Sequence, residues 1–487
     1  MRLSSSDAAD HTVNAVSVDG ATSFRATAVV GFFLLAAVAL SFGASSGPIQ
    51  WMDNGGLMFI ASRGDYFPDE IYATLHPLYQ AVTVWLFNLF GPAAVAYLNS
   101  LLLVPIAYVV YRLGRALELD PPYAAMAALG VILLHNVFWV STKIEVYALH
   151  LLIVLAAYWI VFDEEAARRP SLMVFAVGAL TGLGAATHQL TFIVLFPLYV
   201  YVLPRAGRRI IWAVPGFLLG VFPIYSALFQ SVTAGGDVLR LIRVFLTGSD
   251  GAAVAGWERA LFRFDKMLEG KAYVMLVLVS LCGIGVLGLV LRPASPKLRV
   301  LWWAATLNLL FAVSYRLNDR FTFFLPGAAL YTMLGVAWVS RRYAGYAVAR
   351  YAALAAILAH PLIIVGTFLA ASSGAVTLPT HSVALPYRDD IKYFLVPYLP
   401  DRSAEAFVLA YEKYVPRGSA VMSDFTPMAA LRAAQVNGRF LDRALLQCDE
   451  EHATWPDLVY LVRTDYCAPY LTAYTLEPAP LGWIARK

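Results

Sequence analysis

Long apolar stretches separated by short polar segments fill this sequence from residue 26 to residue 370. A helix needs about 20 mostly apolar residues to cross the hydrocarbon core of a membrane. The pattern predicts an all-α polytopic membrane protein with about eleven transmembrane helices. The predicted spans cover residues 26–42, 93–111, 122–139, 146–162, 171–186, 190–203, 210–228, 272–291, 301–313, 321–339 and 346–370.

A further apolar stretch, residues 78–90, is shorter and suits a helix that lies at the membrane interface. If it does not cross, every short basic cluster falls on one side, and basic residues near span ends mark the cytoplasmic side. The outer loops are then residues 43–92 and 231–271, and the C-terminal segment is extracytoplasmic. The clusters contain Arg112 and Arg115, then Arg168 and Arg169, then Arg205, Arg208 and Arg209, then Arg292, Lys297 and Arg299, then Arg341 and Arg342.

The chain divides into three parts by composition. Residues 1–25 are polar and are expected to form a disordered cytoplasmic N-terminus, and residues 26–371 form the transmembrane part. In the second outer loop, "DVLRLIRVFL" and "WERALFRFDKML" read as amphipathic helices. Residues 372–487 alternate strand patterns ("SAVMSDF", "DLVYLV") with a helix from Pro427 to Gln435, which predicts a small α/β domain.

Composition supports lipid as the solvent of this chain. Hydrophobic residues make up 60% and charged residues 14%, whereas soluble domains carry about 25% charge. The net charge of +4 is small, and no Walker, zinc or dinucleotide motif occurs, so nothing indicates nucleic acid as a partner. Because Cys282 lies in an apolar stretch, Cys448 and Cys467 are the pair left for a disulfide.

Ionisable groups at membrane depth are costly and tend to be functional. Carboxylates, histidines and cations gather at the predicted outer ends of the spans, where a carboxylate could act as general base and a cation could hold a phosphate. The candidate catalytic residues are Asp53, Glu145 and Asp319. The candidate substrate-binding residues are His76, Lys143, His188, Arg316, Asn318 and Arg320.

Each candidate also has a structural interpretation. Asp53 precedes Asn-Gly-Gly, which suits a simple turn, and Glu145 could pair with Lys143 or Arg63. Asp319 lies between Arg316 and Arg320, where a surface ion network is an alternative. His76 and His188 could each be bonded locally at a helix end.

Several motifs together resemble a known family. In order they are "DNGGL" from Asp53, "HP" at His76, "NS" at Asn99, "FWVSTKIEVYAL", "GLGAATH" and "YRLND", followed by "LPYRDDIKYFLVP" and "VPRGSAVMSD" in the tail. This order is similar to that of membrane proteins related to protein O-mannosyltransferases, within the GT-C glycosyltransferase superfamily. Two positions depart from the family pattern: Gly56 stands where a glutamate is usual, and His76-Pro77 is followed by Leu-Tyr-Gln instead of Pro-Gly-Tyr.

The resemblance implies a GT-C fold and an inverting transfer of a sugar from a polyprenyl phosphate to a protein or glycolipid hydroxyl. By analogy, Asp53 would activate the acceptor, and Arg316, Arg320 and Lys143 would hold the lipid phosphate. Glu145, His76, His188 and Asp319 would shape the site. The implied location is the bacterial inner membrane, with the site extracytoplasmic.

Two other functions fit the same residues. One is a transporter or flippase for a lipid-linked precursor, in which carboxylates relay charge. The other is a catalytically inactive family member, suggested by Gly56. The sequence assigns no cofactor and leaves the presence of a divalent metal open.

Overall fold

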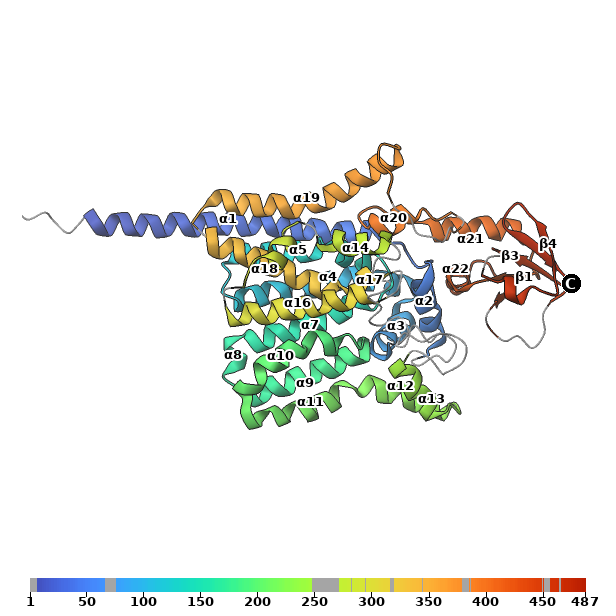
Figure 1. The fold of residues 1–487 in the computed structure, drawn as a ribbon, viewed down its shortest axis with the longest axis horizontal. Coiled ribbons are helices and arrows are strands. Elements are labelled where there is room, and N and C mark those ends of the chain that lie inside the picture. The colour runs from blue at the N-terminus through green and yellow to red at the C-terminus, as the bar shows by residue number, and fades with distance from the viewer. Residues whose placement is uncertain are drawn as a thin grey trace, which may run out of the picture.

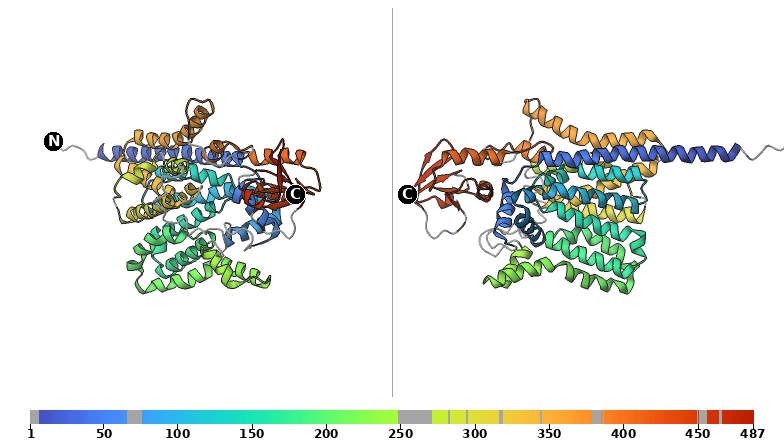
Figure 2. Two further views of the ribbon diagram at one scale, coloured as in Figure 1. Left: turned by 45° about the vertical axis from the view of Figure 1, so that its right-hand side comes forward. Right: turned by 180° about the vertical axis from the view of Figure 1, so that it is seen from behind.

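The fold was taken from a computed structural model. It describes residues 7–65, 76–247, 271–281, 283–293, 295–315, 319–343, 345–378, 385, 387–448, 450, 456–463 and 466–487. A bundle of roughly parallel and antiparallel helices forms the main body, and a small domain with a sheet lies at one end (Figure 1). Two further views show the first described helix extending beyond the opposite end of the bundle (Figure 2).

Most of the chain between residues 7 and 372 is helical because an apolar segment in lipid must satisfy its own backbone hydrogen bonds. The helices of the bundle are α1 (Asp7–Ala44), α4 (Pro92–Ala116), α5 (Pro121–Ile132), α6 (His135–Ser141), α7 (Tyr147–Phe162), α8 (Glu164–Ala167), α9 (Pro170–Thr187), α10 (Thr191–Ala206), the 3-10 helix η2 (Gly207–Trp212), α11 (Ala213–Gly220), α14 (Lys271–Leu281), α15 (Gly285–Val290), α16 (Pro296–Ser314), α17 (Arg320–Phe323), α18 (Leu325–Tyr343) and α19 (Ala347–Ser372).

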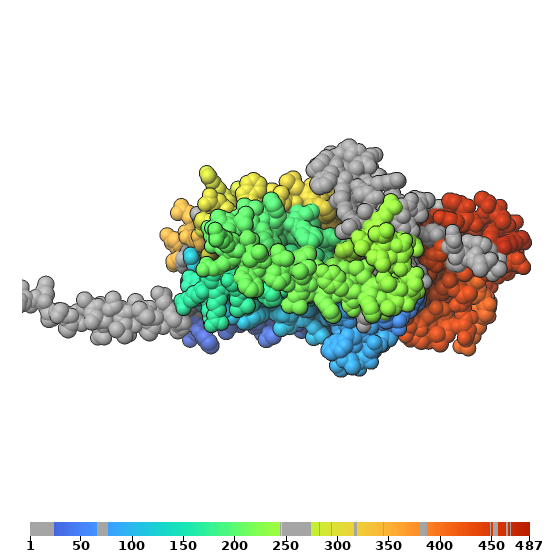
Figure 3. All heavy atoms as spheres, turned by 90° about the horizontal axis from the view of Figure 1, so that it is seen from below, coloured from blue at the N-terminus to red at the C-terminus, as the bar shows by residue number. Residues whose placement is uncertain are grey.

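The number of spans is lower when it is judged by helix length and composition. Within the described residues, five helices are long and apolar enough to cross a membrane, or six if the bent pair α5 and α6 is one span. The eleven apolar stretches all overlap helices, but several of these, such as α7 and α15, are short or interrupted, so a count of eleven is not established. The chain is an integral membrane protein. Helices α10, α11 and α12 (Phe222–Thr233) carry exposed apolar side chains, among them Phe196, Leu218 and Phe229. Seen from below, the green segment that contains α11 and α12 lies at the front of the molecule (Figure 3).

The first helix extends well before the first apolar stretch. Helix α1 begins at Asp7, inside the segment of residues 1–25 for which the sequence predicts disorder. Adding a residue to an existing helix is far easier than nucleating one, and the apolar part of α1 supplies the nucleus.

Shorter helices gather at the end of the bundle that faces the small domain (Figure 1). They include the predicted interfacial helix, observed as α3, and the first predicted amphipathic helix, observed as α13; "WERALFRFDKML" lies outside the described residues. These helices are α2 (Met52–Arg63), α3 (Pro77–Phe90), α12, α13 (Val238–Thr247), α20 (Asp390–Leu395) and α21 (Ser403–Tyr414).

The C-terminal domain has the predicted α/β character. Its sheet has the order β2-β1-β3-β5-β4, in which β2, β1 and β3 are parallel and β5 is antiparallel to both neighbours. Cys448 and Cys467 form a disulfide beside the sheet, as predicted. The elements are β1 (Ala420–Ser423), α22 (Phe425–Val436), β2 (Ala444–Gln447), β3 (Leu458–Leu461), the 3-10 helix η5 (Ala468–Tyr470), β4 (Thr475–Pro478) and β5 (Trp483–Arg486).

Helix α22 of this domain packs directly on α2. A Cβ added to Gly55 would lie 2.7 Å from the carbonyl oxygen of Ala429, so the two backbones are in contact there. Beside this contact, the guanidinium of Arg432 lies 5.4 Å from the Phe59 ring centroid. Trp51, just before α2, is also held by the tail, because its Nε1 donates a hydrogen bond of 2.8 Å to Ser403 Oγ. The C-terminal domain therefore fixes the position of α2.

Candidate active site

The segment between α6 and α7 carries Lys143 and Glu145, and Asn99 of α4 fixes its backbone. Asn99 Nδ2 donates hydrogen bonds to the carbonyl oxygens of Val140, Lys143 and Glu145, at 3.2, 2.8 and 2.5 Å. The neighbouring Ser100 Oγ donates to the carbonyl of Ser141 at 2.8 Å. Side chains of α4 thus bond the Ser141 carbonyl at the end of α6 and the carbonyls of Lys143 and Glu145 beyond it.

The chain around the start of α2 holds the same segment from the other side. Gln50 Oε1 accepts a hydrogen bond of 3.1 Å from the backbone N–H of Ile144. Asn54 Nδ2 donates to the Ile144 carbonyl at 2.9 Å and to Glu145 Oε1 at 3.0 Å. Because Asn54 follows Asp53, these bonds bring the first turn of α2 against Glu145.

Three carboxyl groups lie within electrostatic reach of one another at this point. Asp53 lies in the first turn of α2, Glu145 precedes α7, and Asp319 precedes α17. Burial and the charge of Asp319 raise the pKa of Asp53 to about 7, and burial raises the pKa of Asp319 to about 6 although Arg320 acts against the rise. Burial, with the charges of Asp53 and Asp319, raises the pKa of Glu145 well above its usual value. The group thus contains carboxyls that differ in proton affinity, as acid–base chemistry requires.

Lys143 is buried near these three carboxyl groups. Its side chain is 2% exposed, and Nζ donates a hydrogen bond of 3.1 Å to Ser46 Oγ. Nζ also lies 4.5 Å from the Tyr393 ring centroid and 5.1 Å from that of Trp139. Burial lowers the pKa of Lys143 to about 8, against the charges of Asp401 and Glu145, so the amine remains mostly protonated at pH 7.

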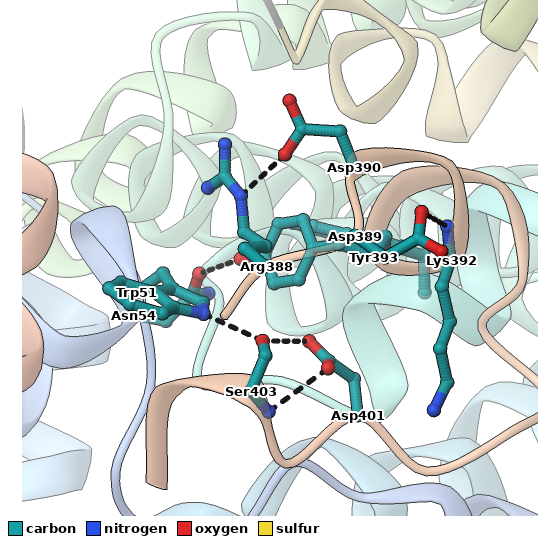
Figure 4. Close-up of polar contacts among 10 residues, drawn as sticks. Trp51, Asn54, Arg388, Asp389, Asp390, Lys392, Tyr393, Asp401 and Ser403 are labelled. Atoms are coloured by element: carbon teal, nitrogen blue, oxygen red, sulfur yellow. Dashed lines mark hydrogen bonds and ion pairs between the residues drawn. The ribbon is translucent and has the colours of Figure 1, made fainter. Parts of the chain in front are cut away.

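A second cation approaches the same tyrosine from the C-terminal tail. The Arg388 guanidinium lies 4.9 Å from the Tyr393 ring centroid, and its Nε is 2.6 Å from Asp390 Oδ1 (Figure 4). The Arg388 side chain is 2% exposed, and its buried Nη1 has no hydrogen-bond partner among the described residues. The Tyr393 hydroxyl in turn donates to Asn54 Oδ1 at 3.3 Å (Figure 4). Two cations therefore contact one ring that is linked to α2.

His76 and His188 stack, with ring centroids 5.4 Å apart and planes 19° apart. His76 Nδ1 lies 2.7 Å from the Thr187 carbonyl, so it carries the proton and its Nε2 is an acceptor. His188 Nδ1 accepts from the backbone N–H of Leu190 at 3.1 Å, so its Nε2 carries the proton. Burial lowers the pKa of His76 to about 4 and that of His188 well below its usual value, so both rings are neutral at pH 7.

Tyr147 of α7 lies between the two histidines and the three carboxyl groups. The ring of Tyr147 lies 5.3 Å from that of His188, and its hydroxyl is within electrostatic reach of Asp319, Glu145 and Asp53. The stacked pair is thus adjacent to the acidic cluster.

Of the three remaining candidate residues, the structure describes only Arg320. Arg320 is 2% exposed and close enough to Asp319 to lower its pKa. Arg316 and Asn318 lie outside the described residues. No group of three histidine, cysteine or carboxylate side chains is arranged around a possible metal position in the described part of the chain.

Sequence reasoning missed Asn54, Tyr393 and Arg388. Asn54 stands beside Asp53, where an amide reads as a turn residue. Tyr393 and Arg388 belong to "LPYRDDIKYFLVP", which was noticed only as a family motif. Its arginine and tyrosine beside two aspartates were the available signal.

Comparison with known proteins places the fold. No protein-family model and no curated protein matches the sequence. Among solved structures, the chain is similar to ArnT from Cupriavidus metallidurans, in a crystal structure of the apo state. The TM-score is 0.60 at 14% sequence identity, and the similarity covers 95% of this chain and 98% of the ArnT chain. The two proteins share a fold over almost their whole length.

Proposed function

We propose that the protein is a membrane glycosyltransferase that moves a sugar from a polyprenyl phosphate to a hydroxyl of a protein or glycolipid. One observation carries this proposal: Asp53, Glu145 and Asp319 lie within electrostatic reach of one another at one end of the bundle, near two buried cations, Lys143 and Arg388. The ArnT-like fold supports it, and the sequence resemblance to the GT-C superfamily points the same way.

Asp53 is the proposed general base. With a pKa of about 7 it is partly ionised at neutral pH and binds a proton strongly enough to remove one from an acceptor hydroxyl. The acceptor oxygen forms a bond to the anomeric carbon while the bond from that carbon to the phosphate oxygen breaks. The proton passes to Asp53, and the polyprenyl phosphate leaves with the bonding electrons. A single displacement of this kind inverts the anomeric centre.

Lys143 and Arg388 are the proposed binding groups for the phosphate. Lys143 Nζ uses one of its protons on Ser46, and Arg388 Nη1 donates to no described residue, so both retain donors for an anion. Hydrogen bonds between charged partners are about twice as strong as neutral ones, and they strengthen as charge develops on the leaving group. Arg320, next to Asp319, is a third candidate.

The stacked histidines are the proposed sugar-binding pair. His76 Nε2 offers an acceptor and His188 Nε2 a donor, and neither nitrogen has a partner among the described residues. Each sugar hydroxyl both donates and accepts, so two neighbouring hydroxyls can bind this pair of neutral rings.

A transporter fits this arrangement less well. Carrier sites lie near the bilayer midplane, typically between broken helices. Here the carboxyls, cations and histidines lie at helix ends, on the side of the bundle that meets the C-terminal domain (Figure 1).

The direct test uses purified full-length protein, radiolabelled polyprenyl-phosphate sugars and a panel of hydroxyl acceptors. Asp53→Asn should lower the transfer rate about 10²–10⁴-fold, because it removes a base and keeps the shape. Asp457→Asn, the same change on an exposed residue of the C-terminal domain, should leave the rate unchanged. Transfer by the Asp53→Asn protein at the wild-type rate would overturn the assignment of the base. Transport of an intact lipid-linked sugar across vesicles, with no transfer to any acceptor, would overturn the function.

A further inference from the structure

A cavity of about 230 Å³ opens at the end of the bundle opposite the candidate active site. It lies between the end of α15, the start of α16 and the last turns of α18. Helix α18 begins at Leu325, two residues after α17, and 19 residues at 1.5 Å each carry its far end roughly 28 Å away. This distance approaches the thickness of the hydrocarbon core, so the cavity faces the other leaflet.

Two of the helices that line the cavity, α15 and α18, pack closely against each other. A Cβ on Gly288 of α15 would collide with the carbonyl oxygen of Tyr331, and one on Gly335 of α18 would collide with that of Ile284. The two backbones therefore touch at these glycines. Leu291 and Trp338, which follow Gly288 and Gly335 by three residues, line the cavity with their side chains.

The lining is apolar inside and cationic at the rim. Leu287, Leu298 and Leu334 supply the apolar part, and three arginines supply the rim. Arg341 already forms an ion pair, because its Nη2 lies 3.6 Å from Glu118 Oε2. Arg292 and Arg342 have no acidic partner within the described residues.

We propose that this cavity binds an anionic phospholipid of the leaflet on that side. The lipid phosphate would contact Arg292 and Arg342, and the upper part of one acyl chain would lie against Leu287 and Leu334. Basic pockets between membrane helices bind anionic head groups, and a tryptophan such as Trp338 is favoured at head-group level. A free phosphate would leave the leucines uncovered, and a neutral lipid would leave the arginines without a counter-charge.

The test measures lipid binding to delipidated full-length protein in a neutral detergent, by native mass spectrometry. Phosphatidylglycerol and phosphatidylcholine with identical acyl chains are compared. Phosphatidylglycerol should bind saturably and at least tenfold more tightly. One arginine near a head group contributes about fivefold in affinity, so the double variant Arg292→Gln/Arg342→Gln should bind phosphatidylglycerol about 25-fold more weakly.

A matched control has the same charge change elsewhere at the same end of the bundle. The double variant Arg208→Gln/Arg209→Gln alters two exposed arginines of η2. Helix α10 begins at the active-site end and η2 follows its other end, so these arginines lie at the same end of the bundle as the cavity. This variant should bind phosphatidylglycerol like the wild type. Equal weakening in both double variants, equal binding of the two lipids, or equally tight binding of free glycerol phosphate would each overturn the proposal.

Discussion

The imidazole rings of His76 and His188 stack at 5.4 Å although the two residues come from separate loops at the same end of the bundle. Their backbone hydrogen bonds fix opposite tautomers, and so one ring presents an acceptor and the other a donor. A pair that is neutral at pH 7 is suited to hydroxyl groups and not to a phosphate.

Replacing either histidine by phenylalanine should therefore weaken sugar binding while keeping an aromatic ring in place. Loss of one neutral hydrogen bond costs about 0.5–1.5 kcal/mol, so the KM for the donor should rise roughly two- to tenfold. The value of kcat should change less, because the bond is present in both ground and transition states. His360→Phe in α19, a buried histidine bonded to the Val279 carbonyl, is the control and should leave KM unchanged. A lower kcat with an unaltered KM would instead assign the histidines to the chemical step.

The pH dependence of kcat/KM should be bell-shaped. On the acid side the rate should rise through about pH 7 as Asp53 loses its proton, and on the alkaline side it should fall from about pH 8 as Lys143 loses its charge. Asp319→Asn removes a negative neighbour that raises the pKa of Asp53, so the acid limb should move to lower pH. An acid limb that stays in place or moves upward in this variant would exclude Asp53 as the group that titrates.

The proposed role of Arg388 in phosphate binding can be tested while its partner Asp390 is also neutralised, so that no unpaired carboxylate is left. The double variant Arg388→Gln/Asp390→Asn keeps a neutral pair of similar size. Loss of a charged hydrogen bond costs about 1.5–3 kcal/mol, so the KM for the donor should rise roughly 10–100-fold in steady-state assays. Asp390→Asn alone keeps the guanidinium and should not raise KM. If both variants raise KM equally, Arg388 acts through packing of the tail and not on the phosphate.

Gly55→Ala should displace α2 and reduce transfer. The added methyl group would meet the carbonyl oxygens of Gln50 and Ala429, and overpacking of this kind costs about 1–3 kcal/mol of stability. Thermal unfolding in detergent and the transfer rate should both fall. Gly366→Ala in α19, where an added Cβ meets nothing within 4 Å, should leave both unchanged. Wild-type stability and rate in Gly55→Ala would show that α2 adjusts freely under the C-terminal domain.

The sequence predicted the helices better than the site because membrane helices leave a strong local signal. An apolar stretch such as residues 93–111 must be helical in lipid, and α4 covers it. The strand patterns of the tail were equally local, and β1 and β3 lie where they were expected. The length of an apolar stretch, however, does not fix the number of crossings, because breaks within a stretch are hard to predict. Helix α10 continues through Pro197 and Pro204, whereas α5 and α6 are bent by 65° within one apolar stretch.

The site was less predictable because its partners are distant in sequence. That Asp53, Glu145 and Asp319 lie at helix ends on one side follows from alternating topology, but their mutual proximity depends on bonds such as that from Asn99 to the Glu145 carbonyl. The approach of Tyr393 to Asn54 joins the tail to the first loop, and no periodic pattern encodes it. The tautomers of the histidines likewise depend on carbonyl and amide positions that side-chain identities do not reveal.

The contact between the first loop and the tail has a consequence for the order of biosynthesis. Trp51 and its partner Ser403 are separated by 352 residues, and a ribosome adds about 5–20 residues per second. Roughly 20–70 s therefore pass between synthesis of the helix that carries Asp53 and synthesis of the segment that holds it. Throughout that interval the helix that carries Asp53 lacks its contact with the tail, so this part of the candidate site is completed late in synthesis. A product truncated before Ser403 would lack the hydrogen bond that holds Trp51 beside α2.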